Sequence, residues 1–442
     1  MRIALMFTLL LVGRGAYAVD VLDAYALALR HDPAFQAALQ QHEAGLQERR
    51  IGLANLLPNL SYAYQTARNR ADVTAPTSTG GGSVHRNYTS SVGALTLQQP
   101  LFDYAAWAQY RQGVARAALA GEQFRGRGQA LVVRVFAAYS QALLAGEQID
   151  LARAQRRAYA EQLQMNRHTF EAGEGTRTDI LETQARFELA QAQELEAGDA
   201  LDGALRELQA MTGAPVSLEQ LAPLAEPFTV PSLQPARFEA WRDLAMQANA
   251  ELAGQRHGLE VAEQEVERQR AGHLPTLKLY ASARRTRSET ENTYGQEYDT
   301  GSLGLQVSVP LFAGGGVLAA QRKASASYAQ ANYEYDAQRN TLLNDLRKQF
   351  NLCTSAVAKV RAYGFAAEAA QALVEATRQS VAGGERVNLD VLDAQQQRYS
   401  ARRDLAEARY GYLNAWLQLK YLAGHLDEAD LVAVARFFQR GQ

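Results

Sequence analysis

The most suggestive chemical pattern in this sequence is a pair of carboxylates at the start of a predicted helix. Asp390 and Asp393 lie three residues apart, so their side chains project from one helix face. Carboxylates this close share protons and concentrate negative charge that attracts cations. The alternative is a solvated acidic face that the positive end of the helix dipole stabilises. The residues alone leave both interpretations open.

Other patterns argue against an enzyme. The glycine runs 80–82 and 314–316 lack the Lys-Ser/Thr of a phosphate-binding loop. The single cysteine, Cys353, excludes both a disulfide framework and a thiolate metal site within one chain. The histidines are scattered without metal-ligand spacing, and no nucleophile lies beside a base. We therefore expect no catalytic residues, no cofactor and no metal.

Composition narrows the class of partner. The chain has 45 basic and 47 acidic residues, a net charge of −2, and no basic cluster, so nothing predicts binding to nucleic acid. Alanine, leucine, glutamate, glutamine and arginine are abundant. These helix-forming residues indicate long helices that pack closely through small side chains.

The N-terminus has the features of a secretory signal peptide. Arg2 precedes an apolar run over 3–12, and Ala16-Tyr17-Ala18 forms a cleavage site. We predict a signal peptide over residues 1–18 and a mature chain from Val19. The alternative, an uncleaved anchor, needs about 20 apolar residues, more than are present. No later apolar run approaches that length, and no cysteine at the cleavage site can carry a lipid.

The rest of the chain repeats itself once. Landmarks recur in the same order at a spacing of about 210 residues, which predicts a duplicated structural unit. The matching segments are 57–60 with 274–277, 100–102 with 310–312, 178–182 with 389–393, and 211–213 with 422–424. We accordingly predict a first repeat at 19–213, a Pro-rich linker at 214–235, a second repeat at 236–424, and a tail at 425–442.

Each repeat predicts a helix, a strand pair, a long helix and a further helix. Helical periodicity over Asp20–Leu56 and Pro235–His273 ends at Leu-Pro pairs. Apolar and polar residues then alternate, which predicts hairpins at about 58–100 and 275–310. Two polar stretches are predicted to form the hairpin turns: Ala71–Asn87 and Ser288–Asp299.

The long helices carry apolar residues at alternating spacings of four and three, which is typical of coiled coils. The stretch from Asp103 to about Phe170 contains no proline and would form a rod about 100 Å long. Only Arg156 and Asn166 interrupt its apolar seam. Seams of the same spacing run over 180–211, 342–381 and 391–422.

Two hairpins give four strands, which cannot close a membrane barrel, because open strand edges in lipid leave backbone groups unsatisfied. Several copies would have to pool their strands, and three copies give about twelve. The alternative is an ordinary soluble sheet packed on the helices. Tyrosines near the strand ends fit an interfacial girdle: Tyr62, Tyr64, Tyr88, Tyr280, Tyr294 and Tyr298.

This order of elements resembles the TolC family of outer-membrane efflux and secretion proteins. The segment 389–395 is the sharpest match, and 170–173 followed by Thr178-Asp179 fits the first-repeat tip. The resemblance implies a mainly α homotrimer with one twelve-stranded barrel in outer-membrane lipid and a coiled-coil tunnel in the periplasm. It also implies an exit duct for an efflux pump or a type I secretion system of a Gram-negative bacterium. A periplasmic adaptor (membrane fusion) protein and an inner-membrane transporter would dock at its closed end.

The resemblance also implies roles for residues at that end. In a trimer, Asp390 and Asp393 would form two stacked carboxylate rings that select cations. Arg386 would pair with Asp179 and hold the tunnel closed, and the alternative is an intrahelical pair of Arg386 with Asp390. The glycines that begin the two tip turns, Gly173 and Gly384, would lie where the adaptor docks.

One departure from the family concerns the second tip, where Gly383-Gly384-Glu385 predicts a more flexible turn than usual. The rival function is a soluble periplasmic coiled-coil scaffold or binding protein. Within the duct interpretation, drug efflux and protein secretion stay open, because the transporter chooses the cargo.

Overall fold

The computed structural model describes residues 19–75 and 82–438. The predicted signal peptide, 1–18, lies outside the described residues. The chain forms two compact units. The helical unit comprises Met1–Gln40, Phe124–Ala250 and Arg339–Gln442, and the strand unit comprises Gln41–Gln123 and Glu251–Gln338. Each is described below by itself.

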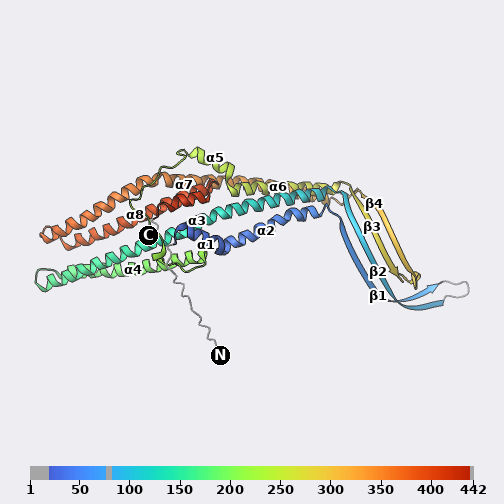
Figure 1. Ribbon diagram of the computed structural model, residues 1–442, viewed down its shortest axis with the longest axis horizontal. Coiled ribbons are helices and arrows are strands. Elements are labelled where there is room, and N and C mark those ends of the chain that lie inside the picture. The colour runs from blue at the N-terminus through green and yellow to red at the C-terminus, as the bar shows by residue number, and fades with distance from the viewer. Residues whose placement is uncertain (1–18, 76–81, 439–442) are drawn as a thin grey trace, which may run out of the picture. The chain divides into compact units, whose positions relative to one another are not determined.

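The described chain is mainly α-helical with one small sheet, which confirms the predicted fold class (Figure 1). The helices are α1 Val21–His31, α2 Pro33–Ala54, α3 Tyr104–Glu171, α4 Arg177–Thr212, α5 Phe238–Ala248, α6 Ala250–Arg270, α7 Gly316–Ala382, α8 Asn388–Leu422 and α9 Glu428–Ala435. The strands are β1 Asn59–Ala75, β2 Gly82–Phe102, β3 Thr276–Arg287 and β4 Glu297–Ser308. Single 3₁₀ turns occupy Leu218–Gln220, Ala271–His273 and Glu291–Thr293.

The predicted helix over Asp20–Leu56 is in fact two helices that meet at Asp32. This buried carboxylate accepts from the backbone N–H of Phe35 (2.7 Å) and from Nη2 of Arg134 (2.6 Å). Asp32 therefore caps the start of α2, where Pro33 needs no N–H partner. The predicted helix over 235–273 is interrupted in the same way at Asn249, whose side chain donates to the carbonyl of Leu422 (2.9 Å).

In the helical unit, α3 and α4 form one antiparallel hairpin and α7 and α8 form another (Figure 1). The predicted seam of α3 is buried from Leu131 to Leu163, and its alanines have almost no exposed surface. The break in this seam at Arg156 has a partner, because its Nε lies 2.5 Å from Oε2 of Glu194 on α4. Burial of these seams confirms the predicted 4-3 packing.

Among the described helices, α3 contains an 18-residue stretch long and apolar enough to cross a membrane. The sequence analysis expected no apolar run of this length after the signal peptide. More than half of it (56%) is buried inside the protein. A core helix of a soluble bundle meets the same criterion, so the stretch is weak evidence for a membrane-spanning helix.

The strand unit contains one antiparallel sheet in the order β1-β2-β3-β4, so β2 and β3 join the two predicted hairpins. The predicted turn Ala71–Asn87 is wrong in extent, since Val73 pairs with Val84 and Ala75 with Gly82. The β-branched residues in this stretch favour continued pairing over a loop. The β3–β4 hairpin is shorter and ends at the pair Arg287 and Glu297.

The register gives this sheet two contrasting faces. One cross-strand row contains Leu60, Leu97, Ala281 and Leu303, and the adjacent row contains Ser61, Thr96, Ser282 and Ser302. Successive side chains point to opposite sides of a strand, so the first row belongs to an apolar face and the second to a polar face. We use these two names below.

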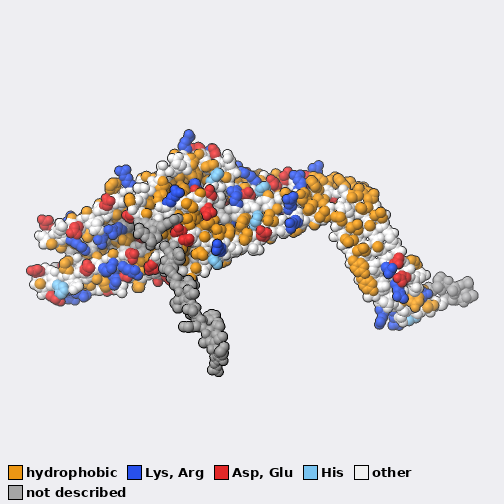
Figure 2. All heavy atoms as spheres, viewed as in Figure 1, with side chains coloured by type: hydrophobic (Ala, Val, Ile, Leu, Met, Phe, Trp, Pro, Cys, Tyr) orange, Lys and Arg blue, Asp and Glu red, His pale blue; other side chains and the backbone are white. Residues whose placement is uncertain are grey.

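The apolar face is unusually exposed for large side chains. The exposed fractions of Leu303, Leu305 and Val307 are 77%, 63% and 66%. Figure 2 shows hydrophobic side chains gathered over the strands, with charged groups toward the turn ends. A contiguous apolar surface of this kind marks contact with lipid or with another protein.

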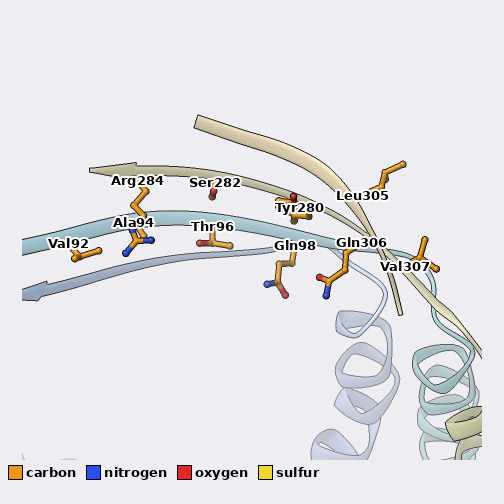
Figure 3. A pocket seen from close by; sticks show the side chains of 10 residues that line it. All are labelled: Val92, Ala94, Thr96, Gln98, Tyr280, Ser282, Arg284, Leu305, Gln306 and Val307. Carbon is orange, nitrogen blue, oxygen red and sulfur yellow. The ribbon is translucent and has the colours of Figure 1, made fainter. Parts of the chain in front are cut away.

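The polar face contains an open hollow of about 800 Å³ lined by β2, β3 and β4. Thr96, Gln98, Ser282 and Gln306 contribute polar groups to its wall. In Figure 3, Gln306 projects from β4 to the side opposite Leu305 and Val307. The sheet thus has an apolar surface on one side and a more polar surface on the other.

Candidate functional site at the helix-hairpin tips

The two helix hairpins end in turns of the same geometry. Gly173 and Gly384 have φ angles of 81° and 77°, a left-handed conformation that favours glycine. In the first turn the N–H of Glu174 donates to the carbonyl of Thr169 (3.1 Å), and in the second Glu385 donates to Ser380 (2.9 Å). No atom of the described chain lies within 4 Å of a side chain built at either glycine. The two predicted docking tips are therefore open to a partner.

Each tip leads into a helix that begins with a capping aspartate. On α4, Asp179 accepts from the N–H of Thr176 (3.2 Å) and from its hydroxyl (2.5 Å). On α8, Oδ2 of Asp390 accepts from the N–H of Val387 (3.3 Å). Carboxylates at these positions satisfy free backbone donors and interact favourably with the helix dipole.

The predicted partners Arg386 and Asp179 do not meet within the described chain. Among the described residues Arg386 forms no ion pair, either with Asp179 or, in the alternative, with Asp390. Asp179 is instead occupied by the cap of its own helix. The latch accordingly stays a prediction.

The two aspartates that the sequence treats alike have different surroundings. Oδ1 of Asp393 lies 2.7 Å from Nη2 of Arg186 on α4, whereas Asp390 caps α8. Asp393 keeps 59% of its side chain exposed, and Arg186 keeps 33%. The sequence analysis did not single out Arg186, which lies off the apolar seam of 180–211.

Close to the tips, four polar side chains form a buried network that the sequence analysis missed. Gln162 donates to Asn166 (3.1 Å) and to Asn388 (2.8 Å). Asn166 and Asn388 both donate to Oγ1 of Thr183, over 2.8 and 3.1 Å. Thr183 has no exposed surface and donates in turn to the carbonyl of Asp179 (2.7 Å).

This tip network links α8 to both helices of the first hairpin. Gln162 and Asn166 lie on α3, Thr183 lies on α4, and Asn388 begins α8. None of these groups carries a charge, so ionic strength will screen the network little. The one sign of this network in the sequence is Asn166, the second polar residue that interrupts the apolar seam of α3.

An apolar cluster continues the contact beyond the network. Tyr159, Ala190 and Leu392 are buried together, and Phe187 packs against them. The hydroxyl of Tyr159 donates to the carbonyl of Leu392 (3.3 Å). Burial raises the pKa of Tyr159, so this hydroxyl stays a hydrogen-bond donor at neutral pH.

The described residues contain no group of three His, Cys, Asp or Glu side chains that could hold a metal ion. The tips therefore offer capping carboxylates, one ion pair and a neutral polar network. Such an arrangement can hold helices together and present charge to a passing solute.

Comparison with known proteins identifies the class of this chain. The family described as outer membrane efflux protein matches residues 24–214 and 241–425, and the chain belongs to this family. It is 53% identical over 434 residues to the alkaline protease secretion protein AprF of Pseudomonas aeruginosa, covering 98% of this chain and 90% of that protein. It is 47% identical over 438 residues to the proteases secretion protein PrtF of Dickeya chrysanthemi, covering 99% and 95%.

More distant relatives and solved structures belong to the same class of outer-membrane protein. The chain is 27% identical over 432 residues to the outer membrane protein TolC of Escherichia coli, covering 94% of this chain and 84% of that protein. Its fold is similar to the outer-membrane channel OprN (TM-score 0.77, 17% identity, 92% and 90% covered). It is also similar to the open state of the MtrE channel of Neisseria gonorrhoeae (TM-score 0.73, 18% identity, 92% and 89% covered).

The predicted resemblance to the TolC family is thereby confirmed. The chain is an outer-membrane exit duct of a Gram-negative bacterium that extends into the periplasm. The rival interpretation, a soluble periplasmic scaffold, is not favoured.

Proposed function

We propose that this chain forms a homotrimeric exit duct of a type I secretion system that exports proteases. The names and identities of the AprF and PrtF relatives support this cargo over small-molecule drugs. The observation that carries the duct itself is the two-faced sheet. In the described chain, β1 and β4 each pair on one side only, which leaves two open edges beside an exposed apolar face.

Open edges cannot remain unpaired in lipid, where each unsatisfied backbone group costs several kcal/mol. Three copies of the four-stranded sheet would supply twelve strands and close the edges onto one another. The apolar face of β4 over 301–308 covers roughly 26 Å of strand. Tilted by about 40°, this gives an apolar band about 20 Å tall, which approaches the roughly 25 Å of outer-membrane barrels.

In this assembly the apolar face contacts lipid and the polar face lines the channel. The hollow beside Thr96, Gln98 and Gln306 then belongs to the water-filled interior. The tips at Gly173 and Gly384 receive a periplasmic adaptor, which connects the duct to an inner-membrane transporter. In the proposed organisation the two repeats, 19–213 and 236–424, each contribute one strand hairpin and one helix hairpin, and the second alone carries the pair Asp390 and Asp393.

Genetic complementation tests the proposal that the duct exports proteases. A strain that lacks its own exit duct but keeps the protease transporter and adaptor should secrete active protease when it expresses this chain. A matched strain that lacks the exit duct of a drug pump should remain drug-sensitive. The opposite result, drug resistance without protease in the medium, would assign the chain to efflux. Cross-linking of the purified protein should stop at three subunits.

We predict that the substitution Arg386→Ala raises the resting conductance of the duct in planar bilayers. The proposed latch between Arg386 and Asp179 joins helices at the closed end, so its loss should favour opening. An exposed ion pair is worth about 1 kcal/mol or less, so we expect roughly a twofold to fivefold rise. Resting conductance equal to wild type would refute the latch.

A second prediction concerns the carboxylate rings, which we propose for Asp390 and Asp393. Since Arg186 pairs with Asp393, the substitution Arg186→Gln should release three carboxylates toward the channel and raise cation preference roughly twofold. The reversal potential in a salt gradient measures this change. Arg206→Gln is the control, because Arg206 forms an exposed pair with Asp202 on the same helix. Equal reversal potentials in the two variants would contradict the ring.

A further inference from the structure

A second hollow, of about 720 Å³, lies toward the turn end of the sheet. Seven of its lining residues have apolar-face positions by register: Tyr64, Thr66, Arg68, Asn87, Thr89, Ser91 and Arg287. Thr66, Ser91 and Arg287 share one cross-strand row, next to the row of Tyr64, Arg285 and Asp299 that follows the last apolar row. This hollow therefore opens on the lipid-facing side, where the apolar band ends.

Two arginines in this hollow stand outside the ion pairs of the described residues, and Glu297, the carboxylate opposite Arg287 in the register, lies closer to Arg285. Arg68 and Arg287 are exposed, and neither forms an ion pair within the described residues. The segment 76–81, which lies outside the described residues, contains no acidic residue. Guanidinium groups on this face thus remain available to an external anion.

The carboxylates on neighbouring positions are already engaged. Asp299 accepts from Nε and Nη2 of Arg285 over 2.6 and 2.9 Å, and Glu297 lies 3.6 Å from the same Nε. Asp72 pairs with His85. Arg285 therefore differs from its neighbour Arg287 in being neutralised, although both occupy the apolar face.

One wall of the hollow is held in a fixed conformation by hydrogen bonds. Ser288 has a φ angle of 47°, its N–H donates to Gln296 (2.9 Å), and its hydroxyl accepts from Gly295 (3.0 Å). Tyr294 packs edge-to-face on Tyr88, with ring centroids 5.8 Å apart. These contacts attach the short turn to β2 and keep the hollow open without a ligand.

The position of the hollow points to its occupant. The strand ends near the turns lie opposite the ends that join the helices, so in an outer-membrane duct they reach the outer leaflet. Tyr64 marks the boundary between the apolar rows and the charged rows, a level at which aromatic side chains meet lipid headgroups. Arginine binds phosphate through paired, charge-assisted hydrogen bonds.

We infer that the hollow at Arg68 and Arg287 binds the phosphorylated headgroup of an outer-leaflet lipid. The acyl chains of the same lipid would lie along the apolar rows that contain Tyr62, Leu95 and Leu60. A free phosphate would gain nothing from those rows, which is why a lipid is the better occupant. The inference rests on the outer-membrane placement of the duct, but not on its cargo.

Lipid binding by the purified full-length protein tests this inference. The probes are phosphatidic acid, phosphatidylcholine and diacylglycerol with identical acyl chains, added to the protein in neutral detergent and counted by native mass spectrometry. We expect phosphatidic acid to bind preferentially. The double variant Arg68→Gln/Arg287→Gln should bind it at least about tenfold more weakly, because it loses two charge-assisted contacts. The matched control is Arg285→Gln/Asp299→Asn, which removes the neighbouring ion pair without a change in net charge and should bind like wild type.

Two further comparisons in this experiment distinguish a lipid site from a free-anion site and from a nonspecific effect of the substitutions. Excess inorganic phosphate should not displace the lipid, and complete displacement would identify a free-anion site and overturn the inference. Equal weakening in Arg285→Gln/Asp299→Asn and in Arg68→Gln/Arg287→Gln would show that the loss comes from a general disturbance of this end of the sheet, and would also overturn the inference. If the double variant does not assemble, Arg68→Lys/Arg287→Lys keeps the charge but not the paired hydrogen bonds, and intermediate binding is expected. Protease secretion is measured separately, so failure of the lipid site leaves the proposed duct untouched.

Discussion

Replacement of Leu305 by arginine is expected to stop the protein from assembling in the outer membrane, whereas the same replacement at Gln306 is expected to be tolerated. The two residues are adjacent on β4 but belong to opposite faces of the sheet. Leu305 is 63% exposed on the apolar face. An arginine on the lipid face of a barrel costs about 2–4 kcal/mol at the middle of the membrane, and each copy in a trimer would incur this cost.

Gln306 provides the matched control because the same charge enters at the neighbouring position. Its side chain projects on the polar face, opposite to that of Leu305 (Figure 3), where a guanidinium would remain solvated. The measurement is the amount of protein in the outer-membrane fraction that stays oligomeric in mild detergent. We expect a loss of tenfold or more for Leu305→Arg and less than about twofold for Gln306→Arg. Similar losses in both variants would show that the two faces do not divide lipid from water.

The substitution Thr183→Val is expected to loosen the tip of α8 from the first helix hairpin. It preserves the volume of the side chain but removes the hydroxyl that accepts from both Asn166 and Asn388. Asn388 then lacks this acceptor and Asn166 keeps only the longer bond to the carbonyl of Asp179 (3.3 Å), so we expect a total cost of about 1–3 kcal/mol. We expect amide hydrogen exchange over the first turns of α8 to accelerate by roughly tenfold or more, and the resting conductance to rise.

Thr178→Val is the control for this experiment, because Thr178 is exposed on the same helix. The variant Thr183→Ser keeps the hydroxyl and should restore slow exchange. If Thr183→Val and Thr178→Val exchange at the same rate, the buried network does not hold the tip. The prediction is independent of the latch at Arg386, since the network lies within one chain and contains no ion pair.

The sequence alone was sufficient to predict those structural features whose physical cause is local or periodic. Alternation around Leu303, Leu305 and Val307 specified a strand, because its period of two is visible in a single segment. The absence of proline between Asp103 and Phe170 specified one uninterrupted helix, which the structure extends from Tyr104 to Glu171. The burial of the 4-3 seams followed from their spacing.

Features that depend on distant partners were not predictable in this way. The break at Asp32 depends on Arg134, which lies 102 residues further along the chain. The length of the β1–β2 hairpin depends on cross-strand register, whereas its polar composition suggested a loop. The tip network brings Gln162 and Asn388 together across 226 residues, and no local pattern marks such a pair.

The sequence predicted which aspartates and glycines belong to the candidate site, but not which residues they contact. Sequence reasoning found the aspartates and the turn glycines, because helix starts and left-handed turns have recognisable residues. It treated Asp390 and Asp393 as equivalent, since spacing alone cannot show that Arg186 approaches only one of them. Whether Arg386 reaches Asp179 depends on contacts beyond a single chain and stays a prediction.

The central strand pair of the sheet has a consequence for biogenesis. β2 ends at Phe102 and β3 begins at Thr276, so about 170 residues must be synthesised between the two strands that pair at the middle of the sheet. The first hairpin is therefore complete long before its neighbour exists. During that interval it presents an apolar surface and an unpaired edge, the features that promote aggregation. Holding chaperones that protect β1 and β2 until the second hairpin arrives should therefore determine the yield of assembled protein.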